Sequence, residues 1–301
     1  MSTPASETRR VQDFWTERHG RSDGGTHDNF FSHPLVAAYV SLRAFGDLTG
    51  QMEALAVQVG ERTRPGARLF SPGCGRAGKE IFLAARFPDH EIVTMDLTPA
   101  ILEEARAEAA RRGLKNLTIE QGDFNRLELE PRSFDMVLGL SSIHHIEALE
   151  HFWSQVRRGL KPGGSVLAEE YIGPNRLQWT AAQQREGTRV LRELVLDEHK
   201  PDHREVVPVP LDVIIAGDPS EAVRSRDILP TCRAAGFDVT AYLGVGCSLL
   251  QPVLMNQVHT YDPRNWEHNL RLMQLFREED RLLRAGVLED DFAAFLAVPK
   301  G

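Results

Sequence analysis

The chain has 301 residues, 42% of them hydrophobic and 26% charged, with a formal net charge of −8, which is ordinary composition for one large globular domain or a domain with a cap. Its Lys and Arg residues form no long run, which argues against a nucleic-acid partner, and no stretch approaches the ~18 consecutive apolar residues of a membrane-spanning helix. Three scattered cysteines without a Cys-x-x-Cys pair, and a first segment without the apolar core of a signal peptide, predict a cytoplasmic protein without disulfides.

Short apolar runs alternate with amphipathic helical stretches between residues 67 and 172. Such alternation predicts a parallel sheet with right-handed crossovers and helices on both faces, whose ligands bind outside the carboxyl ends of the strands. The predicted strands are 67–70, 91–95, 117–119, 134–140 and 165–169, and the predicted helices between them are 78–86, 99–112 and 147–160.

Two regions interrupt this rhythm. The first sixty residues are largely helical in pattern, with a Gly/His/Asp-rich loop at 20–29. Residues 173–230, here called the insertion, combine an amphipathic helix at 178–196 with a Pro- and charge-rich stretch, a length typical of lids and binding loops. Two further strands at 237–245 and 292–298 enclose a helix at 266–284.

We therefore expect an α/β fold with a seven-stranded, mostly parallel sheet and a helical cap built from the N-terminus and the insertion. The expected division is 1–60 for the N-terminal cap segment, 61–172 for the core, 173–230 for the insertion, and 231–301 for the rest of the core with an extra helix.

A glycine-rich turn, Gly73-x-Gly75-x-x-Gly78, lies between the first predicted strand and the helix that follows it. Glycines let the backbone turn tightly and let a ligand touch the main chain, and the helix N-terminus offers unpaired N–H groups. Many nucleotide-binding folds share this motif. A tight turn without a ligand is the alternative interpretation.

Asp96 ends the second predicted strand, roughly 20 positions beyond the glycine turn, where a carboxylate accepts hydrogen bonds from ribose hydroxyls. The alternative is that Asp96 only caps the helix that begins near Thr98. Together the two features indicate an adenosine-containing cofactor, and a nicotinamide dinucleotide would satisfy both.

Two later motifs distinguish between cofactors. Gly122-Asp123-Phe124 follows the third strand, and a Leu-Lys-Pro-Gly-Gly segment at 160–164 precedes the fifth. With these motifs the sequence resembles the class I S-adenosylmethionine-dependent methyltransferases, particularly the branch that modifies small molecules. The resemblance extends over 68–172 and more loosely over 228–245.

The resemblance implies a Rossmann-like fold that moves the methyl group of S-adenosylmethionine to an O, N or C atom of a small molecule, in secondary or specialised metabolism. It places Leu97 and Phe124 on either side of the adenine, Asp123 at the adenine amino group, and the carbonyl of Leu140 at the methionine amine. The glycine turn and the second strand supply the remaining expected cofactor contacts: Ser71, Gly73, Cys74, Gly75 and Asp96.

Ser71 departs from the family pattern, which usually has Asp or Glu at this position. That carboxylate helps to hold the positively charged end of the methionine moiety, whereas a serine can only hydrogen-bond. We therefore expect either a carboxylate from elsewhere in the chain or weaker cofactor binding.

Oxygen and carbon acceptors usually also need a base, which we expect near the ends of strands four and five. The candidates are His144 and His145 after strand four and Glu170 in strand five; strand alternation sends Glu169 to the opposite face. A structural role for the histidines and a salt bridge for Glu170 are the alternatives. Candidate substrate contacts are Trp15 in the N-terminal helix, Tyr171, Arg176 and Trp179.

We expect no metal site. The histidines within 27–33 lie in no predicted helix or hairpin, and Pro201 interrupts the helix that would align His199 with His203. The expected partner is a small molecule, without nucleic acid or membrane, and the 266–284 helix leaves a homodimer contact open. The rival functions are a nicotinamide-dependent oxidoreductase and a methyltransferase homologue that binds the cofactor without transferring methyl.

Overall fold

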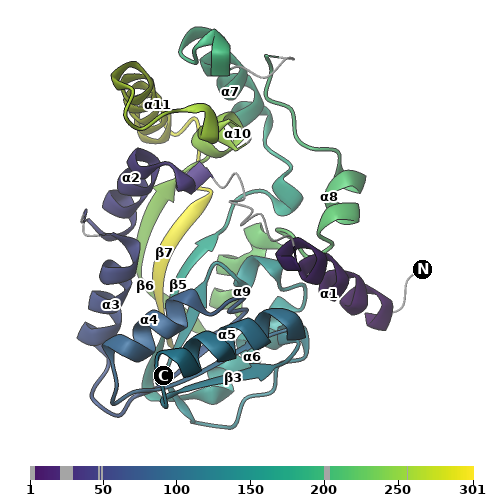
Figure 1. Cartoon of the computed structure of the whole chain (residues 1–301), viewed down its shortest axis with the longest axis vertical. Helices are drawn as coiled ribbons and strands as arrows, with labels where there is room; N and C mark the ends of the chain where they lie inside the picture. The colour runs from purple at the N-terminus through teal and green to yellow at the C-terminus, as the bar shows by residue number, and fades with distance from the viewer. Residues whose placement is uncertain (1–3, 21–29, 47, 49, 200–203, 256) are drawn as a thin grey trace.

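The computed structural model describes residues 4–20, 30–46, 48, 50–199, 204–255 and 257–301. Seven strands form one sheet in the order β3-β2-β1-β4-β5-β7-β6, in which β7 runs antiparallel to both of its neighbours (Figure 1). The strands are β1 (Arg68–Pro72), β2 (Glu91–Asp96), β3 (Leu117–Gln121), β4 (Phe134–Leu140), β5 (Leu160–Tyr171), β6 (Phe237–Gly246) and β7 (Phe292–Pro299).

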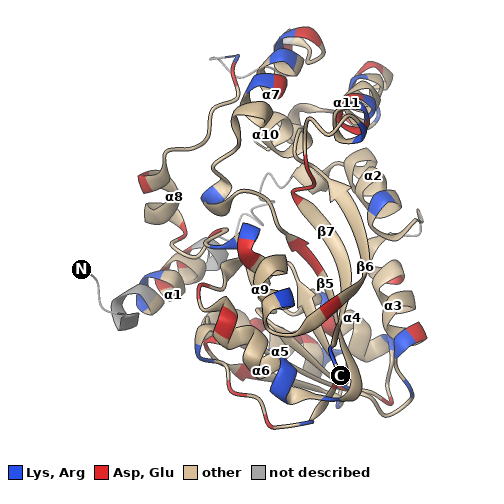
Figure 2. Cartoon of the chain, turned by 180° about the vertical axis from the view of Figure 1, so that it is seen from behind, with Lys and Arg blue, Asp and Glu red and all other residues tan. Residues whose placement is uncertain are grey.

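Helices cover both faces of the sheet. One buried apolar cluster joins α3 and α4 to the sheet, and another joins α6 and α9 to its opposite face, which Figure 2 shows from behind with acidic and basic residues interspersed. The helices are α1 (Pro4–Gly20), α2 (Pro34–Phe45), α3 (Gln51–Arg62), α4 (Gly78–Arg86), α5 (Pro99–Arg111), α6 (Leu149–Gly159), α7 (Ala181–Glu193), α8 (Leu211–Gly217), α9 (Ile228–Ala234), α10 (Leu250–Leu254) and α11 (Trp266–Arg284).

A third apolar cluster forms the cap, which consists of α2, α7, α10 and α11 (Figure 1). Its buried residues include Val40 from α2, Val190 from α7, Leu254 from α10 and Leu272 from α11. The expected cap therefore exists, but α10 and α11 belong to it as well as the N-terminus and the insertion. The buried side of α11, with Leu272 and Leu275, packs inside the protein.

The predicted strand–helix order is confirmed over the sheet, and the largest difference is at the start of β5. Phe134 pairs with Leu160 and Met136 with Ser165, so 161–164 form a bulge within the strand rather than a turn before it. An ion pair stabilises the bulge: the Lys161 amino group lies 2.7 Å from the Asp135 carboxylate.

The insertion contains more regular structure than the sequence predicts. Its first helix is shorter than expected, because a capping box between Thr180 and Gln183 starts α7. Its Pro- and charge-rich stretch contains α8 and leads into α9, which packs on α6. Across the described residues, every helix is too short or too polar to cross a membrane.

Candidate active site

The glycine turn lies where the ends of three strands meet. Gly73 has φ +69°, and a Cβ there would lie 2.6 Å from Cβ of Ser142 and 3.3 Å from the ring of Phe124. The N–H of Gly73 donates to the carbonyl of Met95 across 2.8 Å. Both the backbone angle and the lack of space for a side chain therefore require glycine at this position. The glycine lets β1, β2 and the segment after β4 come into close contact.

Ser71 does not stand alone at the start of this turn. Its hydroxyl donates a 2.6 Å hydrogen bond to the carboxylate of Glu80, in the first turn of α4, and both side chains are buried. Burial raises the pKa of Glu80, and the bond from Ser71 partly opposes this effect. Sequence reasoning missed Glu80; the signal was an acidic residue beside the apolar stripe of that helix.

Asp96 is held by two backbone N–H groups. Its Oδ2 accepts from Gly75 across 2.9 Å, and its Oδ1 accepts from Thr98 across 3.0 Å. Thr98 is the N-cap of α5, but its own hydroxyl makes no capping bond. Each carboxylate oxygen keeps a second lone pair for a ligand, so the capping and ribose interpretations are compatible.

The segment after β3 provides a partly exposed carboxylate. Oδ1 of Asp123 accepts from the N–H of Asn125 across 2.9 Å, whereas Oδ2 has the Arg126 guanidinium 3.9 Å away. The Asp123 side chain is 19% exposed. This leaves Oδ2 available to accept a hydrogen bond from an amino group.

Helix α1 lies across this edge. The amide of Gln12 donates to the carbonyl of Leu97 across 3.0 Å. A hollow of about 490 Å³, a volume ordinary for a ligand site, lies between α1 and the segment after β3. It is lined by Thr8, Arg9, Gln12, Asp13 and Arg126. A second hollow of about 360 Å³ lies near β6 and β7. Three of its lining residues, Ile172, Gly173 and Arg226, come from the segment after β5 and from the insertion.

Glu170 organises the segment that follows β4. Its Oε1 accepts from the N–H groups of Ser142 and Ile143 across 2.7 and 2.8 Å, and its Oε2 lies 2.8 Å from Nδ1 of His144. Burial opposes charge on both groups, yet their mutual contact lowers the pKa of Glu170 and raises that of His144. These contacts favour a positioning role for Glu170; its predicted role as a base stays a prediction.

His145 belongs to a second chain of contacts. Its Nδ1 lies 3.0 Å from the hydroxyl of Ser220, which donates to the Asp218 carboxylate across 2.6 Å. Burial, together with the neighbouring His144, lowers the pKa of His145. The ring of Trp15 on α1 packs edge-on at 5.8 Å. Residues from the core, the insertion and α1 thus meet at the end of β4.

A family model described as a methyltransferase domain matches residues 71–164, which include the glycine turn, Asp96, Asp123 and the bulge of β5. Within this segment the chain carries a methyltransferase domain.

The fold of nearly the whole chain resembles those of solved methyltransferase structures. Geranyl diphosphate C-methyltransferase from Streptomyces coelicolor aligns with a TM-score of 0.58 at 12% identity, over 99% of this chain and 100% of that one. Phosphoethanolamine N-methyltransferase 2 from Haemonchus contortus aligns with a TM-score of 0.55 at 17% identity, over 97% and 60%. At these identities the likeness concerns the fold.

Among curated relatives, sterol 24-C-methyltransferase from Candida albicans is 32% identical over 114 residues, which are 38% of this chain and 30% of that protein. The chain thus matches less than a third of that relative's length.

Three of the predicted substrate contacts have structural partners. Trp179 is buried in the apolar cluster of the cap, and the buried Tyr171 donates its hydroxyl to the carbonyl of Pro174 across 3.1 Å. Arg176 donates to the carbonyls of Pro219 and Glu221 across 2.5 and 3.3 Å. The Trp15 ring packs against His145, and the Tyr171 ring lies 6.4 Å from that of His144. All four stay predictions.

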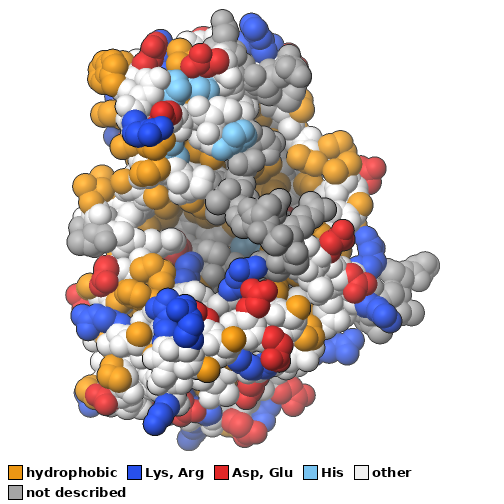
Figure 3. Space-filling model, viewed as in Figure 1, with side chains coloured by type: hydrophobic (Ala, Val, Ile, Leu, Met, Phe, Trp, Pro, Cys, Tyr) orange, Lys and Arg blue, Asp and Glu red, His pale blue; other side chains and the backbone are white. Residues whose placement is uncertain are grey.

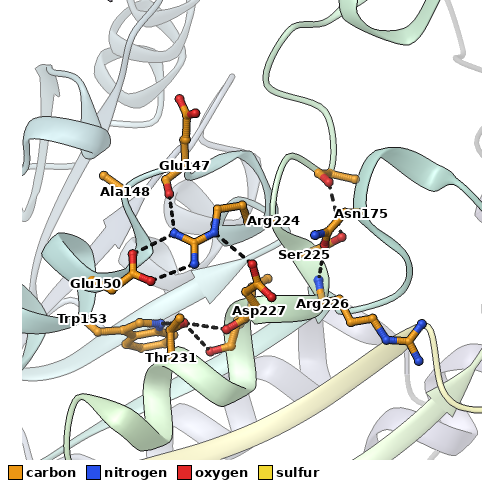
Figure 4. A network of polar contacts seen from close by, with 12 residues as sticks. Glu147, Ala148, Glu150, Trp153, Asn175, Arg224, Ser225, Arg226, Asp227 and Thr231 are labelled. Carbon is orange, nitrogen blue, oxygen red and sulfur yellow. Dashed lines mark hydrogen bonds and ion pairs between the residues drawn. The ribbon is translucent and has the colours of Figure 1, made fainter. Parts of the chain in front are cut away.

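The insertion is fastened to the methyltransferase domain next to these residues. The guanidinium of Arg224 makes two 2.7 Å bonds to the carboxylate of Glu150 on α6 and a 2.9 Å bond to Asp227 (Figure 4). The bond from Arg224 lowers the pKa of Glu150 to about 2. Because Val223 also donates to the carbonyl of His144, the 218–224 segment has a defined position beside the histidine pair. Figure 3 shows the molecule hollowed on the face between the cap and the sheet.

Proposed function

We propose that the chain transfers the methyl group of S-adenosylmethionine to a small-molecule acceptor. The observation that carries the proposal is the meeting of Gly73, Asp96 and Asp123 at one edge of the sheet, inside the segment that matches the methyltransferase domain. A nicotinamide-dependent dehydrogenase requires only the first two of these.

The residues at this edge fit the adenosyl cofactor. Gly73 lets β1 approach the segments that follow β3 and β4 closely, Asp96 retains lone pairs for the ribose hydroxyls, and Oδ2 of Asp123 is available for the adenine amino group. Leu97 and Phe124 follow β2 and β3 in the chain and would flank the adenine, and Leu140, the last residue of β4, would offer its carbonyl to the methionine amine. Glu80, presented through Ser71, provides the carboxylate that the first motif lacks.

When bound, the cofactor supplies an electrophilic methyl group, so the chain's own residues have mainly to position and enclose the reactants. Helix α1 encloses the cofactor side through Gln12, and Trp15 contacts the acceptor side at His145. The hydrogen bond of Nδ1 to Ser220 orients the His145 ring and leaves Nε2 as the nitrogen that faces a reactant.

A small-molecule acceptor is supported by the names of the relatives, which modify sterols, phosphoethanolamine and geranyl diphosphate. The enclosure of the edge by α1 and the insertion agrees with an acceptor small enough to be surrounded. A cytoplasmic location, which the unpaired thiols of all three cysteines support, is part of the same proposal.

The test is transfer of label. The full chain is incubated with S-adenosylmethionine labelled on its methyl group and a fractionated metabolite extract, and low-mass products are counted. We expect labelled product with the parent and at most a tenth of it with Asp123→Asn at subsaturating cofactor. Cofactor binding without label transfer would identify a non-methylating homologue, and a nicotinamide-dependent absorbance change instead would identify an oxidoreductase.

A further inference from the structure

Two histidines and a glutamate converge beside the end of β4. One ligand atom from each of His144, His145 and Glu221 lies within 4.8 Å of those of the other two. His144 and His145 come from the 3-10 turn that follows β4, and Glu221 comes from the insertion. The sequence predicts no metal site because nothing in it places the insertion against this turn.

Both histidines present the nitrogen that a metal requires. Nδ1 of His144 donates to the Glu170 carboxylate, and Nδ1 of His145 donates to the Ser220 hydroxyl, whose own proton goes to Asp218. In each neutral ring, Nε2 is then the atom with the free lone pair. A carboxylate or hydroxyl behind a histidine is the usual outer shell of a metal ligand.

The carboxylate of Glu221 is available. Its backbone carbonyl accepts from Arg176, but within the described part of the chain its carboxylate has no hydrogen bond or ion pair of its own. Two further carboxylates, Glu170 and Asp218, contact the Nδ1 sides of the two histidines. Their negative charges exceed the single positive charge of the nearby Arg176 guanidinium. The local field therefore favours a cation between the three side chains.

A second group in the cap region, Glu198, His199 and His268, meets the same distance criterion. It does not suit a metal, because His268 has no ring nitrogen with a free lone pair. Nδ1 of His268 accepts a hydrogen bond from the N–H of Asp262 across 2.9 Å. Its Nε2 must then carry the ring proton, which it donates to Glu198 across 3.1 Å. Figure 3 shows histidine side chains gathered on the cap, and this group is held by its own hydrogen bonds.

We propose that His144, His145 and Glu221 bind a divalent transition-metal ion. Two imidazoles and one carboxylate are ligands that suit Zn²⁺, Fe²⁺ or Co²⁺ and not Mg²⁺ or Ca²⁺, and three protein ligands leave coordination positions open. The ion joins the insertion to the methyltransferase domain.

The role of this ion rests on the proposed function: its open coordination positions receive an oxygen atom of the methyl acceptor. The ion lies at the carboxyl edge of the sheet, against the Trp15 side chain of the helix that also reaches the cofactor segment at Leu97. The acceptor class is thus one that presents a hydroxyl, phenol or carboxylate oxygen to a metal. This role goes beyond that of a general base for His145.

The test uses Co²⁺ as a spectroscopic probe. The full chain is stripped with chelator and titrated with Co²⁺ while visible absorption is recorded, and Zn²⁺ binding is measured by calorimetry. We expect one ion per chain, and a dissociation constant at least tenfold larger for Glu221→Gln. Glu198→Gln, from the rejected group, is the matched control and should bind as the parent does. His145→Ala is the second variant, and it should also lose the ion.

S-adenosylhomocysteine binding, measured on the same samples, separates the two proposals and reports folding. Loss of Co²⁺ with retained nucleoside binding in Glu221→Gln supports the metal site. An absence of saturable Co²⁺ absorption in the parent, or equal binding by parent and Glu221→Gln, overturns it whatever the nucleoside does. Absent nucleoside binding with intact Co²⁺ binding would refute only the methyltransferase proposal and the acceptor role of the ion.

Discussion

The hydroxyl of Ser71 donates a hydrogen bond to the carboxylate of Glu80 across 2.6 Å, inside the fold and behind the glycine turn. The resemblance to methyltransferases places a carboxylate at position 71, and in this chain the Ser71 hydroxyl instead hydrogen-bonds a carboxylate from the neighbouring helix. We infer that the pair Ser71–Glu80 takes over the role of the missing acidic residue.

Replacing Glu80 should therefore weaken binding of the amino-acid end of the cofactor. We expect Glu80→Gln to reduce affinity for S-adenosylhomocysteine about tenfold, the loss of one charge-assisted interaction of about 1.5 kcal/mol. Affinity for 5′-methylthioadenosine, which lacks the amino-acid end, should stay within about twofold by the same conversion. Calorimetry with both nucleosides checks this, and equal losses for the two would show that Glu80 acts only on folding.

Gly73→Ala should disrupt the glycine turn because its Cβ would lie 2.6 Å from Cβ of Ser142. Gly113→Ala is the matched control, with φ +68° and nothing within 4 Å of the new Cβ. Both variants incur the cost of a left-handed alanine, about 1 kcal/mol. We expect urea unfolding to show a further loss of about 1–3 kcal/mol for Gly73→Ala, as for overpacked sites, together with loss of nucleoside binding. Identical curves for the two variants would contradict the close contact.

Glu279 should make the stability of the cap depend on pH. Burial raises its pKa from the ordinary 4.5 to about 8, although the charge of Arg43 opposes this. Because the folded state holds a proton that the unfolded state has released, this contribution is complete below pH 4.5 and is lost as pH rises through 8. Between pH 6 and 8.5 we expect the free energy of unfolding to fall by about 2 kcal/mol more in the parent than in Glu279→Gln.

Chemical unfolding across this pH range provides the comparison. Glu267→Gln, on the same helix but with a side chain 58% exposed, should keep the slope of the parent. Parallel slopes for all three proteins would mean that Glu279 titrates normally.

The sheet was predictable because each strand from β1 to β4 is an apolar run bounded by a turn or a helix cap, which are local properties. The bulge of β5 was not, because it depends on Phe134 pairing with Leu160, a contact between strands. The extent of helix α9 was not predictable either, since its short apolar face, with Ile228 and Cys232, is recognisable only against α6.

The cofactor edge follows from motifs that lie next to strand ends, so Gly73, Asp96 and Asp123 could be named in advance. Glu80, Ser220 and Glu221 could not, since their place depends on side chains that meet from separate segments. A sequence pattern of period two or 3.6 carries no information about such meetings.

Titration with S-adenosylhomocysteine in a calorimeter is the sharpest check that this edge of the sheet binds an adenosyl cofactor. We expect saturable one-to-one binding by the parent and about tenfold weaker binding by Asp123→Asn, which keeps the acceptor for Asn125 but places an amide opposite the adenine amino group. Asp238→Asn, a surface change at an ion pair with Lys300, should bind like the parent. No saturable heat with this nucleoside, beside clear binding of a nicotinamide dinucleotide, would contradict the account.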